Sequence, residues 1–283
     1  MILDGKVVAK TIKSKVKYAV SDIAKAKNIV PHLVVIQVGD DPASSVYISG
    51  KQADCAEVGI KFTWKHLKAD TTEIELKQLI SRLNKSQTVT AILVQLPLPK
   101  KINPNILDSI SPKKDADGLN PENIAALYKG KSGIIPCTPK GIIEILKYYD
   151  LPIVGKKAVI VGRSQIVGKP LALALLNENA TVSICHSKTK NLSEETKTAD
   201  ILIAAIGQAN FIKKEMIKKD VILIDVGINR VDGKLCGDID FNDCKDNCMA
   251  ITKVPGGIGL MTRAALLENV FELFLKNNAG KKI

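Results

Sequence analysis

A glycine-bounded turn between an apolar strand and a helix carries the strongest chemical signal in the chain. The expected strand, residues 157–161, ends at Gly162, and a helix follows from Gly168 with proline in its first turn. Unpaired N–H groups and the helix dipole attract anions, and glycine lets the backbone approach them. We therefore predict a phosphate cradle for a dinucleotide, although the six-residue glycine spacing also fits an ordinary strand-to-helix turn. The candidate cofactor ligands in this turn are Gly162, Arg163, Ser164 and Gly168.

The segment after the next apolar run indicates which dinucleotide binds. Residues 180–185 lead into His186, Ser187 and Lys188, where NAD-binding proteins carry an acidic residue for the ribose hydroxyls. Hydroxyl and cationic groups suit a 2′-phosphate instead, and Arg163 offers a planar set of donors. The sequence therefore favours NADP over NAD, with Ser187 as a ligand. A cap on the following segment is the alternative role for Ser187.

A second group of polar residues lies in the first half of the chain. Tyr47 and Lys51 are four residues apart in an expected helix and share one face of it. Gln95 closes an apolar strand, and Asp117 lies in an acidic turn. Loops at the carboxyl ends of parallel strands are where α/β proteins gather reacting groups. Each of these features alone also fits an ordinary helix face or turn.

Gly50 lies inside the same expected helix, between Tyr47 and Lys51. Glycine in a helix interior costs roughly 1 kcal/mol relative to alanine. The residue therefore indicates that another part of the protein packs closely against the helix at this point.

The apolar segments that must position these residues alternate between strand and helix spacing. This alternation predicts an α/β fold with parallel sheets covered by helices. We expect helices over residues 6–28, 43–58 and 264–276, and a further helix after a capping box at Thr72 and Glu75. The expected strands are residues 33–38, 62–67, 91–96, 158–161, 181–185, 201–205 and 221–226. Residues 230–235 are expected to form a hairpin, and the tail from Asn277 is expected to fray. Two domains follow: a substrate domain over residues 1–139, to which residues 262–283 return, and a Rossmann-like NADP-binding domain over residues 140–261, with a cleft between them.

Composition excludes several other classes of protein. The chain of 283 residues is 46% hydrophobic but has no apolar run near the ~20 residues that span a bilayer, and it opens without a signal segment. We expect a soluble, cytoplasmic protein that binds no membrane. The net charge is +12, but only residues 82, 163, 230 and 263 are arginine and 4% of residues are aromatic, which argues against nucleic-acid binding. The 6 cysteines form no Cys-x-x-Cys, so no metal site is expected.

Taken together and in this order, the segments resemble the bifunctional methylenetetrahydrofolate dehydrogenase/cyclohydrolase family over nearly the whole chain. The matching stretches are residues 45–51, 94–99, 114–118, 136–141, 162–168, 185–187, 225–229 and 255–259. Leu260 departs from the pattern, because the family usually has proline there. Several unrelated strings in a fixed order are far more specific than any one of them.

The resemblance implies two activities in one cleft. The first is NADP-dependent oxidation of 5,10-methylenetetrahydrofolate to the methenyl cation, and the second is hydrolysis of that cation to 10-formyltetrahydrofolate. A monofunctional dehydrogenase of the same family is the alternative, and the presence of Lys51 argues against it. A second, more distant alternative is a protein that binds ligands in the cleft without turnover. The resemblance also implies a homodimer built through the nucleotide-binding domains.

The resemblance further implies roles for the individual residues. Lys51 is the base of the hydrolysis or, in its charged form, stabilises the developing oxyanion. Gln95 orients Lys51 or the water, and Tyr47 stacks on the substrate or hydrogen-bonds it. Asp117 accepts paired N–H donors of the pterin ring. The remaining implied contacts are Pro255 and Gly256 along the path of the substrate and the backbone of Ile228 at the cofactor.

Overall fold

The computed structural model describes residues 1–279, which divide into two compact units. The unit that we call the six-stranded unit contains Met1–Lys10 and Thr138–Thr262. The three-stranded unit contains Thr11–Cys137 and the described residues from Arg263 onward. The boundaries fall within helices α1 (Gly5–Lys27), α5 (Cys137–Tyr148) and α9 (Ile258–Asn278).

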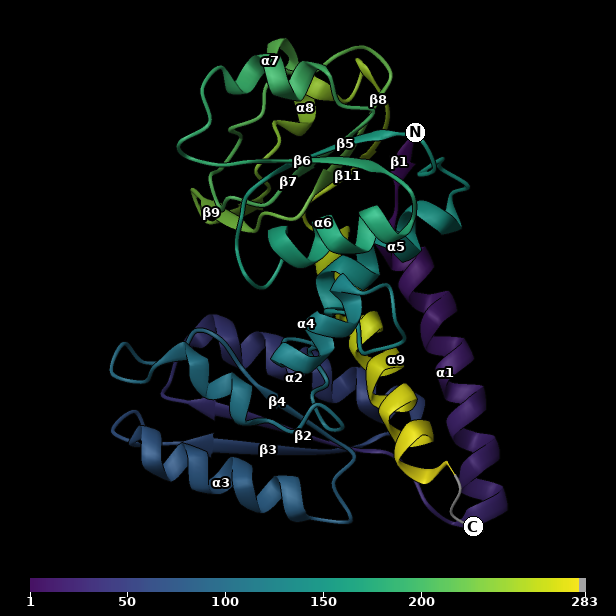
Figure 1. Cartoon of the computed structure of the whole chain (residues 1–283), viewed down its shortest axis with the longest axis vertical. Helices are drawn as coiled ribbons and strands as arrows, with labels where there is room; N and C mark the ends of the chain where they lie inside the picture. Colours follow the sequence, from purple (N-terminus) through teal and green to yellow (C-terminus); the bar gives the residue numbers. More distant parts are fainter. Residues whose placement is uncertain (280–283) are drawn as a thin grey trace. The chain divides into compact units, whose positions relative to one another are not determined.

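The six-stranded unit is built on one parallel sheet with the order β1-β11-β8-β7-β5-β6 (Figure 1). Every neighbouring pair of strands in this sheet is parallel. Its strands are β1 (Ile2–Leu3), β5 (Lys157–Val161), β6 (Thr181–Cys185), β7 (Ile201–Ala204), β8 (Val221–Asp225) and β11 (Cys248–Thr252). Helices lie on both faces of the sheet, so the central strands β7 and β8 are buried along their whole length and are apolar except for Asp225.

Strand β5 lies between β6 and β7, so the chain crosses from one side of β5 to the other after β6. Figure 1 shows α6 on one face of the sheet and α7 and α8 on the other. Such a reversal is the point at which α/β sheets bind nucleotides, outside the carboxyl ends of the strands. The connecting elements are α6 (Gly168–Asn177), α7 (Leu192–Lys197), a 3₁₀ turn η2 (Lys214–Met216), α8 (Phe241–Cys244) and the predicted antiparallel hairpin of β9 (Asn229–Val231) and β10 (Lys234–Cys236).

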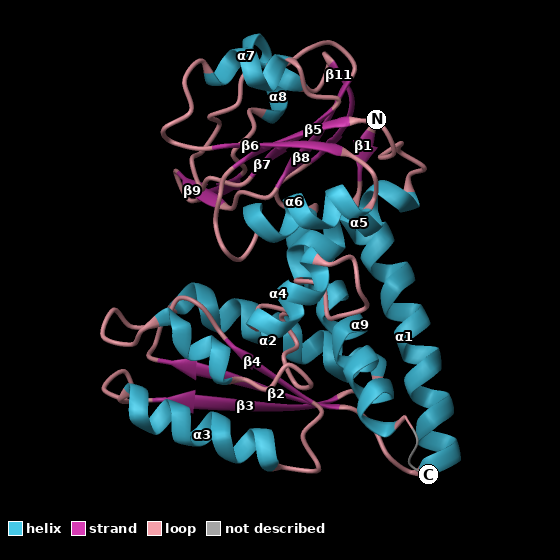
Figure 2. Ribbon diagram, viewed as in Figure 1, coloured by secondary structure: helices cyan, strands magenta, loops and turns pink. Residues whose placement is uncertain are grey.

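The three-stranded unit contains a second parallel sheet, with the order β3-β2-β4. Helices also cover both of its faces (Figure 2). One face packs Leu76 and Ile80 of α3 against β2 and β4, while the other packs against α1, α2 and α9. The elements of this unit are β2 (His32–Val38), α2 (Pro42–Val58), β3 (Lys61–Leu67), α3 (Glu73–Lys85), β4 (Ala91–Val94), a 3₁₀ turn η1 (Pro104–Ser109) and α4 (Pro121–Tyr128).

The local signals in the sequence account for the ends of the helices in this unit. The Asp41 carboxylate accepts the Ser44 amide at 2.7 Å, so α2 begins at Pro42. It ends at Gly59, whose φ of 81° is in the left-handed region. The predicted capping box of α3 is present, because Thr72 and Glu75 hydrogen-bond each other's backbone amides.

The first ten residues belong to the six-stranded unit, which corrects the predicted domain division. Strand β1 pairs in parallel with β11, and the terminal ammonium of Met1 donates to the Met249 carbonyl at 2.7 Å. Strand β1 has only two residues, which is too short for a hydrophobic periodicity to show in the sequence. Strand β11 is also absent from the strands predicted from the sequence.

Two further elements differ from the expected ones by more than one residue at an end. Strand β4 ends at Val94, so Gln95 lies in the loop that follows the strand. Helix α9 begins at Ile258, earlier than expected, and continues through Asn277, where the frayed tail was predicted. The Asn277 side chain donates to the Lys113 carbonyl at 2.8 Å, which holds the last turn in place. The rest of the predicted tail, residues 280–283, lies outside the described residues.

Across residues 1–279, no helix combines the length and the apolar character needed to cross a membrane.

Candidate active site

Lys51 and Gln95 form a hydrogen-bonded pair in the three-stranded unit. The Lys51 ammonium donates to Gln95 Oε1 at 2.8 Å. Gln95 in turn donates its Nε2 to the Leu96 carbonyl at 2.8 Å, which fixes which end of the amide faces the lysine. Helix α2 supplies Lys51, and the loop after β4 supplies Gln95 at the carboxyl edge of the sheet. The structure therefore brings together two residues that are 44 positions apart in the chain.

Lys51 is only 8% exposed, and its surroundings change its acidity. Burial lowers the pKa of Lys51, and the charge of Arg263 lowers it further, while the Asp117 carboxylate acts in the opposite direction. A lysine with a lowered pKa more readily adopts the neutral form that accepts a proton. The site can therefore use Lys51 in proton transfer.

Tyr47 lies one helical turn before Lys51 and is half-buried. Burial raises the pKa of Tyr47, so its hydroxyl keeps its proton at neutral pH and can donate a hydrogen bond. Its ring and hydroxyl share a helix face with Lys51, as the spacing predicted.

The two carboxylates of the acidic turn have different surroundings. Asp115 is buried and accepts hydrogen bonds from the Gly118 amide at 3.0 Å, the Asn120 amide at 2.7 Å and Asn123 Nδ2 at 3.0 Å. Asp117 is half-exposed and accepts no hydrogen bond from the described residues. Asp115 therefore builds the turn, and Asp117 remains available to a ligand.

The glycine turn of the six-stranded unit is closed by contacts within the backbone. Gly162 has a φ of 133°, and a Cβ there would collide with the Ala205 carbonyl after β7. A Cβ at Gly168 would collide with the Gly162 carbonyl. Both positions therefore require glycine, because the turn folds tightly against β7 at the point where the sheet reverses direction.

Ser164 caps the start of α6 from inside this turn. Its hydroxyl oxygen accepts the amides of Val167 at 3.2 Å and Gly168 at 3.3 Å. The serine hydroxyl hydrogen is then still able to donate outward. Arg163, Ser164 and Gln165 are all exposed on this turn.

Arg163 and Ser187 follow adjacent strands. Strands β5 and β6 are paired so that Val161 lies opposite Cys185, and each of the two residues comes two positions after its strand end. The Gly162 amide donates to the Cys185 carbonyl at 2.9 Å and ties the two loops together. The alternative role of Ser187 as a helix cap is wrong, because α7 has Asn191 at its N-cap position.

Ile228 lies in the loop between β8 and β9 and is 47% exposed. Two buried carboxylates hold this loop in place through hydrogen bonds. Asp225 accepts the Gly227 amide at 3.1 Å, and Asp238 accepts Asn229 Nδ2 at 2.9 Å. Pro255 and Gly256 belong to the six-stranded unit, in the loop before α9, and Pro255 is exposed.

Sequence reasoning missed one polar contact beside Lys51. Arg263 of α9 donates its Nε to Asp54 Oδ2 at 2.6 Å, and Asp54 lies one turn after Lys51 on α2. The only signal in the sequence was Gly50, whose missing side chain indicated a close neighbour without identifying it.

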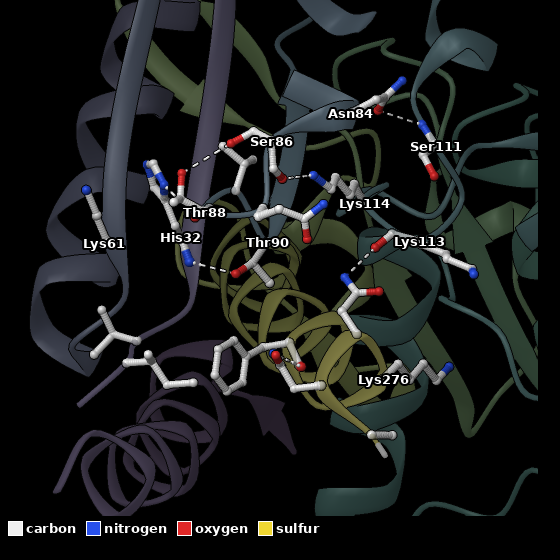
Figure 3. A pocket seen from close by; sticks show the side chains of 18 residues that line it. His32, Lys61, Asn84, Ser86, Thr88, Thr90, Ser111, Lys113, Lys114 and Lys276 are labelled. Atoms are coloured by element: carbon white, nitrogen blue, oxygen red, sulfur yellow. Dashed lines mark hydrogen bonds between the residues drawn. The ribbon is translucent and has the colours of Figure 1, made fainter. Parts of the chain in front are cut away.

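A cavity of about 980 Å³ lies at the opposite edge of the same sheet, where β2 and β3 begin (Figure 3). None of the predicted site residues lines it. Polar groups that line it already have partners: the buried His32 has its Nε2 2.9 Å from Thr63 Oγ1, and the partly buried Lys114 donates to the Leu83 carbonyl at 2.9 Å. The predicted site residues Lys51 and Gln95 lie at the other edge of this sheet.

The fold and site define a class of dinucleotide-dependent α/β oxidoreductases in which one parallel unit carries a nucleotide turn and another carries the reacting side chains. The catalytic-domain model of tetrahydrofolate dehydrogenase/cyclohydrolase matches residues 3–117, and the corresponding NAD(P)-binding-domain model matches residues 136–278. The chain belongs to the tetrahydrofolate dehydrogenase/cyclohydrolase family.

Individual relatives agree with this assignment. The bifunctional protein FolD of Lachnoclostridium phytofermentans is 51% identical over 271 residues, covering 95% of this chain and 96% of that protein. The structure of the bifunctional FolD enzyme from Campylobacter jejuni has a TM-score of 0.94 at 47% identity, covering 96% of this chain and 98% of that one. The Trypanosoma brucei FolD structure, which contains NADP and an inhibitor, has a TM-score of 0.95 at 33% identity and covers 99% of both chains.

Proposed function

We propose that this chain oxidises 5,10-methylenetetrahydrofolate to the methenyl cation with NADP and then hydrolyses the cation to 10-formyltetrahydrofolate. The observation that carries the proposal is the buried Lys51–Gln95 pair, 2.8 Å apart, in a chain that also has a closed dinucleotide turn. The Campylobacter jejuni enzyme is named as a bifunctional methylenetetrahydrofolate dehydrogenase/cyclohydrolase, and the Lachnoclostridium phytofermentans relative is named as a bifunctional protein, which supports both steps.

The oxidation needs accurate positioning more than a strong base, because the cation it forms is stabilised by two nitrogens. NADP, when bound, accepts the hydride. We propose that Asp117 holds the pterin N–H donors through its two oxygens and that Tyr47 stacks on the ring or hydrogen-bonds it. Pro255 and Gly256 complete the substrate contacts in this proposal.

The hydrolysis needs a water to attack the methenyl carbon and lose a proton. The C–N5 bond of the adduct then breaks as the hydroxyl proton leaves and N5 takes up a proton, so the formyl group stays on N10. Neutral Lys51 donates one N–H to Gln95 Oε1 and keeps its lone pair free, because the Gln95 amide is fixed by Leu96. We propose that this lone pair accepts the proton of the attacking water. The ammonium that forms is then placed to stabilise the oxygen of the product.

The cofactor ligands in this proposal follow from the two loops beyond β5 and β6. Arg163 and Ser187 bind the 2′-phosphate, since these loops leave adjacent strands and Gly162 is bonded to Cys185. Gly162, Ser164 and Gly168 would hold the phosphates of the cofactor, and Ile228 would approach the cofactor through its backbone. A side chain at Gly162 or Gly168 would collide with the backbone, which fits a turn whose backbone lies close to the cofactor phosphates.

We also propose that the protein acts in the cytoplasm as a homodimer joined through its nucleotide-binding domains, with folates as its small-molecule partners. Residues 140–261 form the core of that domain in our proposal. Light scattering across a range of concentrations tests the dimer, and a single monomeric mass at micromolar concentration contradicts it.

Two absorbance assays test the proposed activities. The first follows NADPH formation from 5,10-methylenetetrahydrofolate and NADP. The second follows loss of the methenyl compound without any cofactor, with the spontaneous hydrolysis rate subtracted. Activity in both supports the bifunctional enzyme, activity in the first alone identifies a monofunctional dehydrogenase, and activity in neither, with folate binding retained, identifies a binding protein.

A further inference from the structure

Gly50 leaves a slot on helix α2 that the side chain of Arg263 fills. A Cβ at Gly50 would lie 2.7 Å from both Cζ and Nη1 of Arg263. The Nη2 of Arg263 donates to the Gly50 carbonyl at 2.8 Å. The guanidinium therefore lies against the helix backbone at Gly50, and a side chain at this position would have to displace it. This contact is the close packing that Gly50 indicated in the sequence.

Asp54 holds the other edge of the same guanidinium. The Arg263 Nε donates to Asp54 Oδ2 at 2.6 Å, and the Asp54 side chain is only 10% exposed. The second Asp54 oxygen accepts from Lys13 of α1 at 3.3 Å. One carboxylate therefore links α1, α2 and α9, so Arg263 has both a steric slot and a counter-ion.

The anchored face of α2 is also the face that carries the proposed chemistry. Lys51 directly follows Gly50, and Tyr47 and Asp54 lie one turn before and after it. The Arg263 charge acts on both neighbours: it lowers the pKa of Tyr47 against the effect of burial, and it adds to the burial that lowers the pKa of Lys51.

We propose that Arg263 is a positioning residue for the hydrolysis. Its contacts with Gly50 and Asp54 hold α2 so that Lys51 reaches Gln95, and its fixed charge favours the neutral form of Lys51. This inference rests on the proposed role of Lys51 and adds a residue that does not itself touch the reacting atoms.

Three variants test the proposal in the cofactor-independent hydrolysis of the methenyl compound. Arg263→Met removes the anchor and the charge, Arg263→Lys keeps a charge but loses the paired donors, and Gly50→Ala fills the slot. Each is expected to lower kcat about 10- to 100-fold with a smaller change in KM, because the reacting group is displaced. Gly50→Ala is decisive, since alanine favours the helix and yet is expected to lower the rate.

The pH dependence of the hydrolysis rate distinguishes a positioning role of Arg263 from a purely structural role. Removing the positive charge raises the pKa of Lys51, so the limb of the rate profile that follows Lys51 moves to higher pH in Arg263→Met. Arg263→Lys is expected to stay closer to the wild-type limb. Labelling of Lys51 by an amine-reactive acetyl donor, measured by mass spectrometry across the same pH range, reads the titration without any turnover.

Two matched controls accompany these variants. Ser49→Ala changes the exposed neighbour of Gly50, and Arg82→Lys makes the same substitution at an exposed arginine of α3. Both are expected to keep wild-type rates. Folded Arg263→Lys and Gly50→Ala proteins with wild-type kcat, or an Arg263→Met protein with an unchanged Lys51 labelling profile, overturn the proposal. A wild-type protein that does not hydrolyse the methenyl compound refutes the proposed function instead, and the labelling profile still tests Arg263.

Discussion

The amide of Gly162 donates to the carbonyl of Cys185 at 2.9 Å and joins the loop that carries Arg163 to the loop that carries Ser187. Both loops are exposed and leave adjacent parallel strands. Arg163 and Ser187 therefore lie on neighbouring loops at the carboxyl edge of the sheet, the edge at which α/β proteins bind dinucleotides. We propose that cofactor choice is determined at this edge.

Replacing Ser187 with aspartate is expected to lower the preference for NADP over NAD. A carboxylate repels the 2′-phosphate and offers an acceptor to the ribose hydroxyls of NAD. One charge-assisted contact contributes about 1.5–3 kcal/mol, so the ratio of the two kcat/KM values should fall about tenfold or more. Raising the ionic strength should narrow the difference between wild type and variant. A ratio that does not change would place the phosphate elsewhere.

Lys51→Met is expected to reduce both activities severely and to leave NADP affinity unchanged. The lysine lies in the three-stranded unit, whereas the glycine turn lies in the six-stranded unit. The apolar chain of methionine fills a similar buried volume without a proton acceptor, so the fold should persist. Fluorescence titration with NADPH measures the affinity, and a loss of affinity as large as the loss of turnover would contradict the assignment.

Alanine substitutions of the two aspartates of the acidic turn are expected to have different effects, one on activity and the other on stability. Asp117→Ala should raise the folate KM or abolish activity without unfolding the protein, since leaving pterin donors unpaired costs about 1–3 kcal/mol or more. Asp115→Ala should instead lower the denaturation midpoint, because three buried donors lose their acceptor. Denaturant titration and substrate kinetics on both variants distinguish them. Normal folate affinity in Asp117→Ala would make this residue a turn residue only.

The sequence predicted most of the fold because its signals are local. The N-cap at Asp41, the capping box at Thr72 and the glycine stop at Gly59 depend on neighbours within a few residues. Strand β1 could not be found, since its pairing with β11 joins residues at opposite ends of the chain.

For the candidate site, the sequence likewise indicated individual residues but not the contacts between distant parts of the chain. Residue types and the family resemblance pointed to Lys51, Gln95 and Asp117, and the structure adds that the neighbouring Asp115 is buried and hydrogen-bonded within the turn. The partner of Gly50 was beyond sequence reasoning, as Arg263 lies 213 positions further along the chain. Burial, which sets the pKa of Lys51, likewise depends on contacts that no local pattern contains.

Stability is expected to decrease as the pH rises from about 4 towards 7, with Asp225 as a main cause. Burial and the neighbouring Asp238 carboxylate, opposed by hydrogen bonds from three backbone amides, together raise the pKa of Asp225 from 3.8 to about 7. Folded protein therefore holds a proton on Asp225 at pH values where the unfolded chain has released it. The stabilisation is complete below the unfolded pKa and is lost as the pH passes through the folded pKa.

Asp225→Asn tests this pH dependence directly, because asparagine cannot ionise. Its amide nitrogen cannot accept a backbone N–H as a carboxyl oxygen does, so its midpoint of urea denaturation should be lower than that of wild type at pH 4 but should change less between pH 4 and 7. Glu215→Gln, at an exposed position of η2, is the matched control and should keep the wild-type slope. If wild type and Asp225→Asn lose stability in parallel over this range, Asp225 is already ionised in the folded protein, and its three amide donors outweigh its burial.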